Sequence, residues 1–214
     1  MNPLEYREYY RRKLPHIQPA GATLFVTFRL TNSIPKARIQ EFQDEKALIE
    51  KRLGQIRNPK EQKREANKIQ SFLFGKWDAL LDRAQNGPYW LRENPIAELV
   101  AQALYHRDTN EYDLIAFCIM PNHVHVVLKP LEREDATNYA LSAILHSLKR
   151  YTASEANKCL NRQGSFWQHE NYDHYVRNAQ ELARITHYVI LNPVKAGLVR
   201  EWQHWKWSFS KYVE

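Results

Sequence analysis

Apolar positions along this chain follow two periods, and each change of period marks a new element. Stretches rich in β-branched and aromatic residues predict strands at 22–30, 111–120 and 123–129. The Met-Pro-Asn turn between the last two predicts that they are neighbours in one sheet. Two shorter strands are predicted at 165–168 and 172–177.

A spacing of three and four residues between apolar positions predicts a helical hairpin after the first strand, at about residues 37–85. Its two runs carry Ile39, Phe42, Ile49, Leu53 and Ile56, then Ala66, Ile69, Leu73, Trp77, Leu80 and Ala84. Asn58-Pro59 breaks the period between them, and Asn86-Gly87-Pro88 is a closing turn signal. We interpret the hairpin as an insertion whose charged residues form a solvated face.

Three further helices are predicted from apolar stripes and start signals. Asn94 is placed to cap a helix with Pro95 at its first position. A long helix carries Leu141, Ile144, Leu145 and Leu148, and the capping-box spacing of Thr152 and Glu155 predicts a second segment reaching Leu160. Asn178 and Glu181 open a last helix that should end before Pro193.

Strands and helices in this mixed order predict an α+β sandwich, in which helices pack on one antiparallel sheet. With no internal repeat and no low-complexity linker, the chain is expected to form a single domain over residues 1–214, with the hairpin inserted into it.

Charge adds a class of partner to this outline. The 214 residues carry a formal charge of +7, with a pI near 9.3, and 12% of them are aromatic. Cations that meet phosphates and rings that stack on bases suit a nucleic-acid surface. The helical hairpin is then a second candidate for contact with DNA, although a solvated face is the simpler interpretation of its charged residues.

The same sequence argues against several other classes. Cys118 and Cys159 form no C-x-x-C pair, so neither a disulfide framework nor a thiolate zinc site is indicated. Because no apolar run approaches membrane-spanning length, we expect a cytoplasmic protein.

Met120 to Lys129, MPNHVHVVLK, places His123 and His125 on one face of a strand, with Val124 on the core face. We expect the histidine face to be open. Two neutral imidazoles at this spacing can hold a metal ion if other ligands join them. A solvated polar face is the common explanation of an isolated His-x-His.

Tyr188 and Asn192 lie four residues apart in the last predicted helix and would share one of its faces. Taken singly, Tyr188 could be a half-buried core residue and Asn192 could be turn chemistry before Pro193. Taken with the histidines, they suggest a tyrosine nucleophile beside a divalent cation that polarises a phosphodiester. Mg²⁺ prefers oxygen ligands, so a site with two nitrogen ligands also fits Mn²⁺.

Several motifs together resemble the REP-associated tyrosine transposases, a group of the HUH (His-hydrophobic-His) single-tyrosine transposases. They are YREYYRRKLPH, ATLFVTFRL, MPNHVHVVLKP, LHSLKRYTASEANK, GSFWQHENYDHYVRN and YVILNPVKAGLV. The resemblance covers the whole chain apart from the helical hairpin. It implies a ferredoxin-like fold with a central antiparallel sheet.

The resemblance also implies a role for each matching residue. His123 and His125 would be metal ligands, and Tyr188 the nucleophile that cuts single-stranded DNA through a 5′-phosphotyrosine intermediate. Asn192 would be the third ligand, where related insertion-sequence enzymes have glutamine. The expected cofactor is Mg²⁺ or Mn²⁺, and the expected partner is a REP-type DNA hairpin at the nucleoid.

Tyr172 and Tyr175 are rival nucleophiles that lack a ligand-type residue at matching spacing. Asp173 and His174 match a family motif, for which a hydrogen-bonding role competes with a catalytic one. The candidate DNA contacts are basic residues, each with a solvated surface as the alternative: Arg11, Arg12, Lys13, Lys149, Arg150 and Arg177. Trp202, Trp205 and Trp207 are expected to pack rather than to stack on bases.

Two alternative functions remain open from the sequence. One is a domesticated protein that binds DNA hairpins without cutting them, and the other is a hydrolase in which a metal activates water. The resemblance points to a monomer with its tyrosine in cis, although related insertion-sequence enzymes are dimers.

Overall fold

The computed structural model describes residues 5–11, 15–82, 87–134 and 137–212. The chain forms two compact units. The smaller is Asn32–Pro88, and the larger comprises Met1–Thr31 and Tyr89–Glu214.

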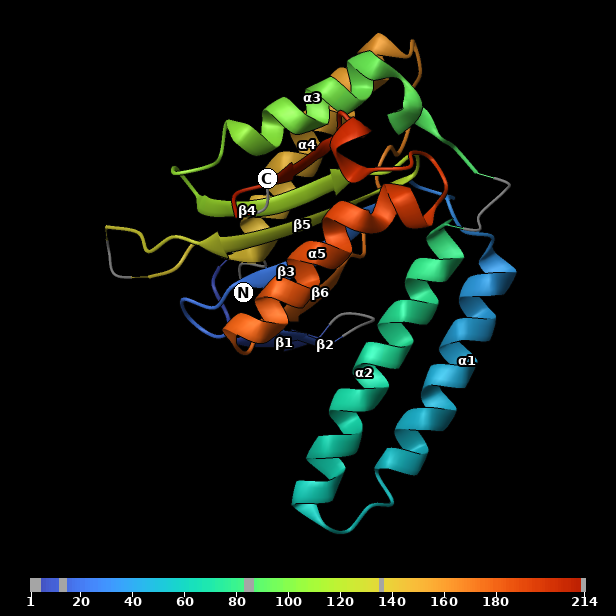
Figure 1. Cartoon of the computed structure of the whole chain (residues 1–214), viewed down its shortest axis with the longest axis vertical. Helices are drawn as coiled ribbons and strands as arrows, with labels where there is room; N and C mark the ends of the chain where they lie inside the picture. The colour runs from blue at the N-terminus through green and yellow to red at the C-terminus, as the bar shows by residue number, and fades with distance from the viewer. Residues whose placement is uncertain (1–4, 12–14, 83–86, 135–136, 213–214) are drawn as a thin grey trace. The chain divides into compact units, whose positions relative to one another are not determined.

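The larger unit is built on a five-stranded sheet with the order β6-β3-β5-β4-β7 (Figure 1). Every neighbouring pair in it is antiparallel. The strands of the chain are β1 (Tyr9–Arg11), β2 (Pro15–Ile17), β3 (Leu24–Arg29), β4 (Tyr112–Ile119), β5 (His123–Pro130), β6 (Tyr172–Tyr175) and β7 (Ser208–Ser210). β1 and β2 pair in a separate two-stranded sheet.

The order of elements confirms the predicted fold class. The helices are α1 (Lys36–Leu53), α2 (Pro59–Asp82), α3 (Asn94–Tyr105), α4 (Leu141–Cys159) and α5 (Ala179–Lys195), with short 3₁₀ turns η1 (Trp90–Arg92) and η2 (Trp202–His204). The series β3-α3-β4-β5-α4-β6, with β3 and β5 central, is the β-α-β-β-α-β arrangement of ferredoxin-like folds. β7 extends this sheet at its β4 edge.

The two faces of the sheet are covered by different helices. One face packs its apolar side chains against α3 and α4: Leu24, Val26 and Phe28 of β3 and Val124, Val126 and Leu128 of β5 join Val100, Leu104, Leu145 and Leu148 in one core. α5 contacts β4, β5 and β7 and crosses in front of the strands in Figure 1. Alternation therefore points the odd-numbered residues of β3 and β5 towards the α5 side.

α4 is one continuous helix, so the predicted restart at Thr152 is wrong. The Thr152 hydroxyl donates to the carbonyl oxygen of Leu148, 2.7 Å away, and accepts from Trp167 Nε1 at 2.9 Å. Glu155, the other half of the expected capping box, pairs with Lys158. Both side chains are thus engaged by partners inside a helix rather than at its start.

α5 begins as predicted but ends later. The Asn178 side chain accepts a hydrogen bond from the Glu181 N–H at 2.8 Å, which confirms the N-cap. Pro193 lies inside the helix, so the predicted end before it is wrong. Proline removes only its own N–H donor, and in the last turn the Ala196 N–H still reaches the Asn192 carbonyl at 2.9 Å.

Two smaller predictions also fail. Glu93 rather than Asn94 precedes the first turn of α3, which places Pro95 at the second helical position. No strand forms at 165–168; this segment makes an isolated bridge between Trp167 and Leu30. A bridge at the end of β3 is too short to form a ladder.

The smaller unit contains α1 and α2, which begin one residue before the range of about 37–85 predicted for the hairpin and end inside it. The two helices pack through Phe42 and Trp77, whose ring centroids lie 5.1 Å apart, and through an ion pair between Glu45 and Lys76. The Asn58 side chain accepts from the Lys60 N–H at 3.0 Å, at the break predicted from the sequence. That the hairpin belongs to a single domain stays a prediction.

No helix among the described residues could span a bilayer.

Candidate metal centre and nucleophile

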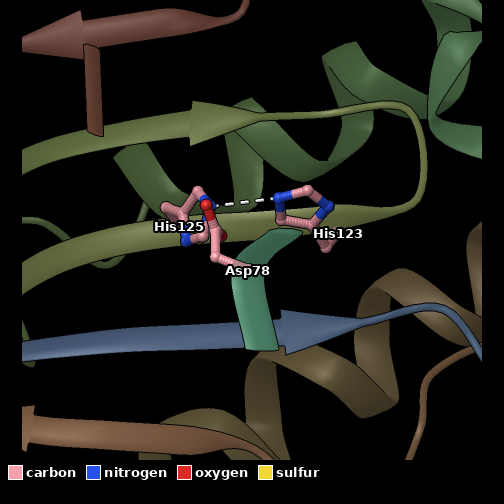
Figure 2. Close-up of side chains that lie close together, drawn as sticks. All are labelled: Asp78, His123 and His125. Atoms are coloured by element: carbon pink, nitrogen blue, oxygen red, sulfur yellow. Dashed lines mark hydrogen bonds between the residues drawn. The ribbon is translucent and has the colours of Figure 1, made fainter. Parts of the chain in front are cut away.

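His123 and His125 project from β5 with their rings turned towards one another, as Figure 2 shows. Their Nε2 atoms are 3.0 Å apart and their ring centroids 4.6 Å apart. Both side chains are fully buried, so the expectation of an open face is wrong. The sequence pattern identified the shared face but not the packing of α5 on that side of the sheet.

The opposite nitrogen of each ring is held by a polar neighbour. His125 Nδ1 lies 2.8 Å from the hydroxyl oxygen of Thr27, its cross-strand partner on β3. His123 Nδ1 lies 2.6 Å from the side-chain oxygen of Asn122. Partners on Nδ1 fix the orientation of a metal-binding imidazole and select its tautomer. Each ring thereby turns its Nε2 towards the other ring.

This geometry suits either of two states. Adjacent ligands in an octahedral shell with bonds of about 2.1 Å lie about 3.0 Å apart, and the two Nε2 atoms lie 3.0 Å apart. Alternatively, one ring donates an Nε2–H to the other. If both Nδ1 atoms carry the protons and donate to Asn122 and Thr27, two lone pairs face each other and a cation would relieve their repulsion.

Tyr188 lies beside this pair. Its ring centroid is 5.8 Å from that of His125 and 6.3 Å from that of Phe25, both residues on the α5 side of the sheet. Lys195 Nζ, two helical turns further along α5, lies 3.9 Å from the same ring. The structure therefore brings together the predicted nucleophile and one predicted ligand, and adds a cation that the sequence analysis did not single out.

Asn192 follows Tyr188 by one turn of α5 and is fully buried. Its backbone carbonyl accepts from the Ala196 N–H. Its burial places the side chain on the inner side of the helix, as a shared face with Tyr188 requires. Its role as a third ligand stays a prediction.

The rival tyrosines separate by face. Tyr172 pairs with Thr27 across β6 and β3 and contacts the Phe25 ring at 6.4 Å, so it shares the sheet face with the histidines. Tyr175 pairs with Leu24 and packs against the α3–α4 core. Position thus keeps Tyr172 as a rival to Tyr188 and leaves Tyr175 on the far face.

Asp173 and His174 both make structural hydrogen bonds. Asp173 accepts from Gln18 at 3.4 Å and from Asn171 at 3.2 Å. His174 Nε2 lies 3.1 Å from Glu181 Oε1 and thereby ties β6 to the first turn of α5. These contacts agree with the hydrogen-bonding alternative for the motif.

Burial and hydrogen bonds together set the charge states of His174 and Glu181. Burial lowers the pKa of His174 more than the neighbouring carboxylate of Glu181 raises it. For Glu181, burial acts to raise the pKa, but hydrogen bonds from the Arg177 N–H and from His174 outweigh it and the pKa is lowered. The resting pair is therefore a neutral imidazole that donates to a carboxylate.

Thr27 and Arg29 are the residues of this face that the sequence analysis missed. Arg29 pairs with His123 in register, and burial lowers its pKa to about 10. The signal was present in ATLFVTFRL, where polar residues at 27 and 29 interrupt an apolar strand at alternate positions. Such spacing predicts a polar strip facing whatever covers that side of the sheet.

The predicted DNA contacts on α4 lie away from the histidines. Lys149 Nζ donates to the carbonyl oxygens of Gln168 at 3.1 Å and His169 at 3.3 Å. Arg150 is exposed, and no described residue forms an ion pair with it. Their contacts with phosphate stay predictions.

The remaining basic candidates are less well defined. Arg177 lies 4.0 Å from Glu181 and 5.7 Å from the centre of the Tyr175 ring. Arg11 ends β1, whereas Arg12 and Lys13 lie outside the described residues. Among the three tryptophans near the C-terminus, Trp207 is buried and Trp205 donates to the Ile119 carbonyl at 3.0 Å, as packing residues do.

Comparisons with known proteins agree with the motifs. Residues 92–191 match the family model described as Transposase IS200 like. A Haemophilus influenzae protein described as a REP-associated tyrosine transposase is 29% identical over 105 residues, which is 45% of this chain and 58% of that relative. The chain thus spans less than two thirds of the relative that it matches.

A solved structure of a REP-associated tyrosine transposase bound to a REP hairpin is 16% identical, with a TM-score of 0.46 over 95% of this chain and 81% of the other. His123, His125 and Tyr188 lie inside the family match, and Asn192 follows its last residue. Residues 92–191 therefore resemble the IS200-like transposases, and the resemblance of this chain to the REP-associated tyrosine transposases is confirmed.

Proposed function

We propose that this protein is a metal-dependent enzyme that nicks and rejoins single-stranded DNA at REP-type hairpins. The observation that carries the proposal is the contact between Tyr188 and His125, whose Nε2 faces that of His123. A nucleophile beside two converging imidazoles is the arrangement that covalent cleavage of a phosphodiester needs. Because both residues belong to one chain, it also supports a site completed in cis.

The residues of the site would act in sequence on one phosphodiester. The Tyr188 phenolic oxygen attacks phosphorus and gives up its proton, the bond from phosphorus to the 3′ oxygen breaks, and that oxygen takes up a proton. The products are a 5′-phosphotyrosine link and a free 3′ hydroxyl. Attack of a 3′ hydroxyl on the link reverses the step, restores the phosphodiester and releases the phenol.

His123 and His125 would hold the divalent cation through Nε2, and Asn192 would add an amide oxygen. When bound, the cation polarises the phosphodiester and neutralises charge that develops on its oxygens. Thr27 and Asn122 would keep the imidazoles aligned throughout. Lys195 lies where its charge could attract the phosphate towards the Tyr188 ring.

The test is covalent capture of a labelled single-stranded hairpin oligonucleotide in the presence of Mn²⁺, read on a denaturing gel. The wild type should give a protein–DNA band that chelation of the metal prevents. Tyr188→Phe should lose this band and all cleavage, yet bind the hairpin with nearly unchanged affinity, because only the phenolic oxygen is removed.

Two matched variants sharpen the assignment. Tyr172→Phe changes the rival on the same face, and Tyr175→Phe changes a tyrosine on the opposite face. Both should retain capture. A band that survives in Tyr188→Phe and disappears in Tyr172→Phe would transfer the nucleophile to Tyr172. Free cleaved DNA without a band would indicate attack by water, and binding without cleavage would indicate a domesticated hairpin binder.

A further inference from the structure

Arg29 is a buried cation on the face of the sheet that carries the histidines. Only 6% of its surface is exposed, and alternation along β3 puts its side chain on the same side as those of Phe25 and Thr27. Burial lowers the pKa of Arg29 to about 10, so the side chain is still charged at neutral pH. Burying a charge costs a fold free energy, and such groups gather at functional sites.

Arg29 lies directly opposite His123. The two residues pair in register between β3 and β5, and in the next pair the Leu30 N–H donates to the Asn122 carbonyl at 2.9 Å. Hydrogen-bonded and non-hydrogen-bonded pairs alternate in an antiparallel ladder, so Arg29 and His123 form a non-hydrogen-bonded pair with Cα atoms about 4.5 Å apart. Side chains approach most closely in pairs of this type. The guanidinium group therefore belongs to the surroundings of the histidine pair.

The nucleophile and Arg29 lie at different points along β3. The centroid of the Tyr188 ring is 6.3 Å from that of Phe25 and 5.8 Å from that of His125, which pairs with Thr27. Arg29 lies two residues beyond Thr27, about 7 Å further along the strand. A phosphate bound at the histidines would thus have the phenol towards one end of β3 and the guanidinium towards the other.

An in-line displacement develops charge on the side away from the nucleophile. The entering phenolic oxygen and the departing 3′ oxygen lie on opposite sides of phosphorus, and the 3′ oxygen becomes negative as its bond breaks. A guanidinium group carries several N–H donors in one plane and matches the oxygens around phosphorus. Removing one such donor from a site sheltered from water slows a reaction by about 10²- to 10³-fold.

We propose that Arg29 is a catalytic residue that donates hydrogen bonds to the departing 3′ oxygen. The inference rests on the proposed function and assigns a group to the leaving side of the same reaction. The Tyr188 phenol gives its proton to water, the electron pair of the broken bond stays on the 3′ oxygen, and that oxygen takes a proton from water. Arg29 keeps its own protons. In the reverse step the same donors orient the 3′ hydroxyl for attack on the phosphotyrosine link.

The test is chemical rescue in single-turnover cleavage of a single-stranded hairpin oligonucleotide with Mn²⁺. Once the cleaved bond has been mapped, a second oligonucleotide carries sulfur in place of the 3′ oxygen at that bond. A thiolate is a weaker base than an alkoxide, so it departs without the help of a hydrogen bond. Both oligonucleotides are cleaved by the wild type and by three variants.

Arg29→Met removes the charge at similar length, and Arg29→Lys keeps the charge without the planar fork of donors. Arg107→Met is the matched control, because it removes another buried arginine from the layer of α3 and α4 on the opposite face of the sheet. There Arg107 donates to the Ala103 carbonyl at 2.8 Å and to the Ser147 hydroxyl at 3.0 Å.

With the oxygen substrate, Arg29→Met should cleave about 100- to 1,000-fold more slowly than the wild type, and with the sulfur substrate less than about tenfold more slowly. Arg29→Lys should lie between the two proteins on the oxygen substrate. Arg107→Met should match the wild type on both substrates. The Mn²⁺ affinity of Arg29→Met should equal or exceed that of the wild type, because a cation near the site is removed.

An equal loss with both substrates would give Arg29 a structural role, and an unchanged rate with the oxygen substrate would also overturn the proposal. If Arg29→Met does not fold, the same comparison of the two substrates is made with Arg29→Lys. A wild type that forms no covalent band with the unmodified hairpin would instead contradict the proposed function, so the two failures are distinguishable.

Discussion

Single polar atoms decide what the histidine pair can do. The Thr27 hydroxyl and the Asn122 side-chain oxygen contact the two Nδ1 atoms, and this leaves the two Nε2 atoms facing each other. The imidazoles are therefore set up by residues that would never touch DNA. A substitution at such a residue should change the metal affinity and leave the fold intact.

Thr27→Val tests this directly. Valine has nearly the shape of threonine and favours strands, but it cannot bond to His125 Nδ1. We expect Mn²⁺ affinity and cleavage to fall by about 10- to 100-fold, the range seen when such supporting partners are removed. Titration calorimetry with Mn²⁺ checks the affinity. Unchanged metal binding would show that the hydroxyl is dispensable.

Thr152→Val is the matched control, since it removes the same hydroxyl from a buried site on the other face. There the Trp167 N–H loses its acceptor, and an unsatisfied buried donor costs about 1–3 kcal/mol of stability. The unfolding midpoint in urea should fall while metal affinity stays at the wild-type value.

At the scale of elements, the contact between the buried His174 and Glu181 links β6 to α5. His174 has its pKa lowered by burial in spite of Glu181 beside it, so the folded protein binds a proton there less readily than the unfolded chain. As the pH falls below the ordinary histidine value of 6.5, unfolding takes up protons and is favoured. The stability conferred by neutral His174 is present above that value and is lost in acid.

The melting temperature should accordingly decrease between pH 7.5 and pH 5.5, and His174→Gln should decrease less over the same interval. Glu181 acts in the same direction but only below its ordinary pKa of 4.5, outside this window. His187→Gln replaces an exposed histidine on the same helix and should leave the pH dependence as in the wild type. A slope identical in His174→Gln and the wild type would contradict the assignment.

Local sequence signals predicted most helices and strands, but they mispredicted where some of the helices begin or end. Alternation and helical spacing located β3, β4, β5 and the five α-helices, and Asn178 caps α5 as its spacing with Glu181 predicts. Thr152 was misread because its hydroxyl bonds Trp167, a partner fifteen residues away. Pro193 was misread because a missing N–H matters little in the last turn of a helix.

The meeting of Tyr188 with His125 could not be derived from spacing alone. Sixty-three residues separate them, and their contact depends on which face of the sheet α5 covers. The resemblance of this chain to a transposase family predicted that Tyr188 acts with the histidines. Strand alternation alone predicted only that the two histidines share a face. Arg29 shows the same limit, since its alternation with Thr27 was visible but its burial was not.

At the scale of the whole molecule, the net charge determines how strongly DNA binding depends on salt. Each phosphate neutralised by the protein contributes about −0.7 to −0.9 to the slope of log K against log salt concentration. A net charge of +7, with basic side chains on α4, predicts a steep slope. If the protein neutralises about four phosphates, affinity for a single-stranded hairpin should fall roughly a hundredfold between 50 and 200 mM salt.

Replacing Lys149 and Arg150 together by alanine should lower affinity for every hairpin sequence alike and flatten the slope by about one for each phosphate that the variant no longer neutralises. Fluorescence anisotropy at four salt concentrations measures both quantities. The stem should matter less than the free strand, because a tyrosine can reach phosphorus in line only where the backbone can bend into the site. An unchanged slope would assign both side chains to the solvated surface, and equal affinity of the wild type for duplex and hairpin would remove the substrate assignment itself.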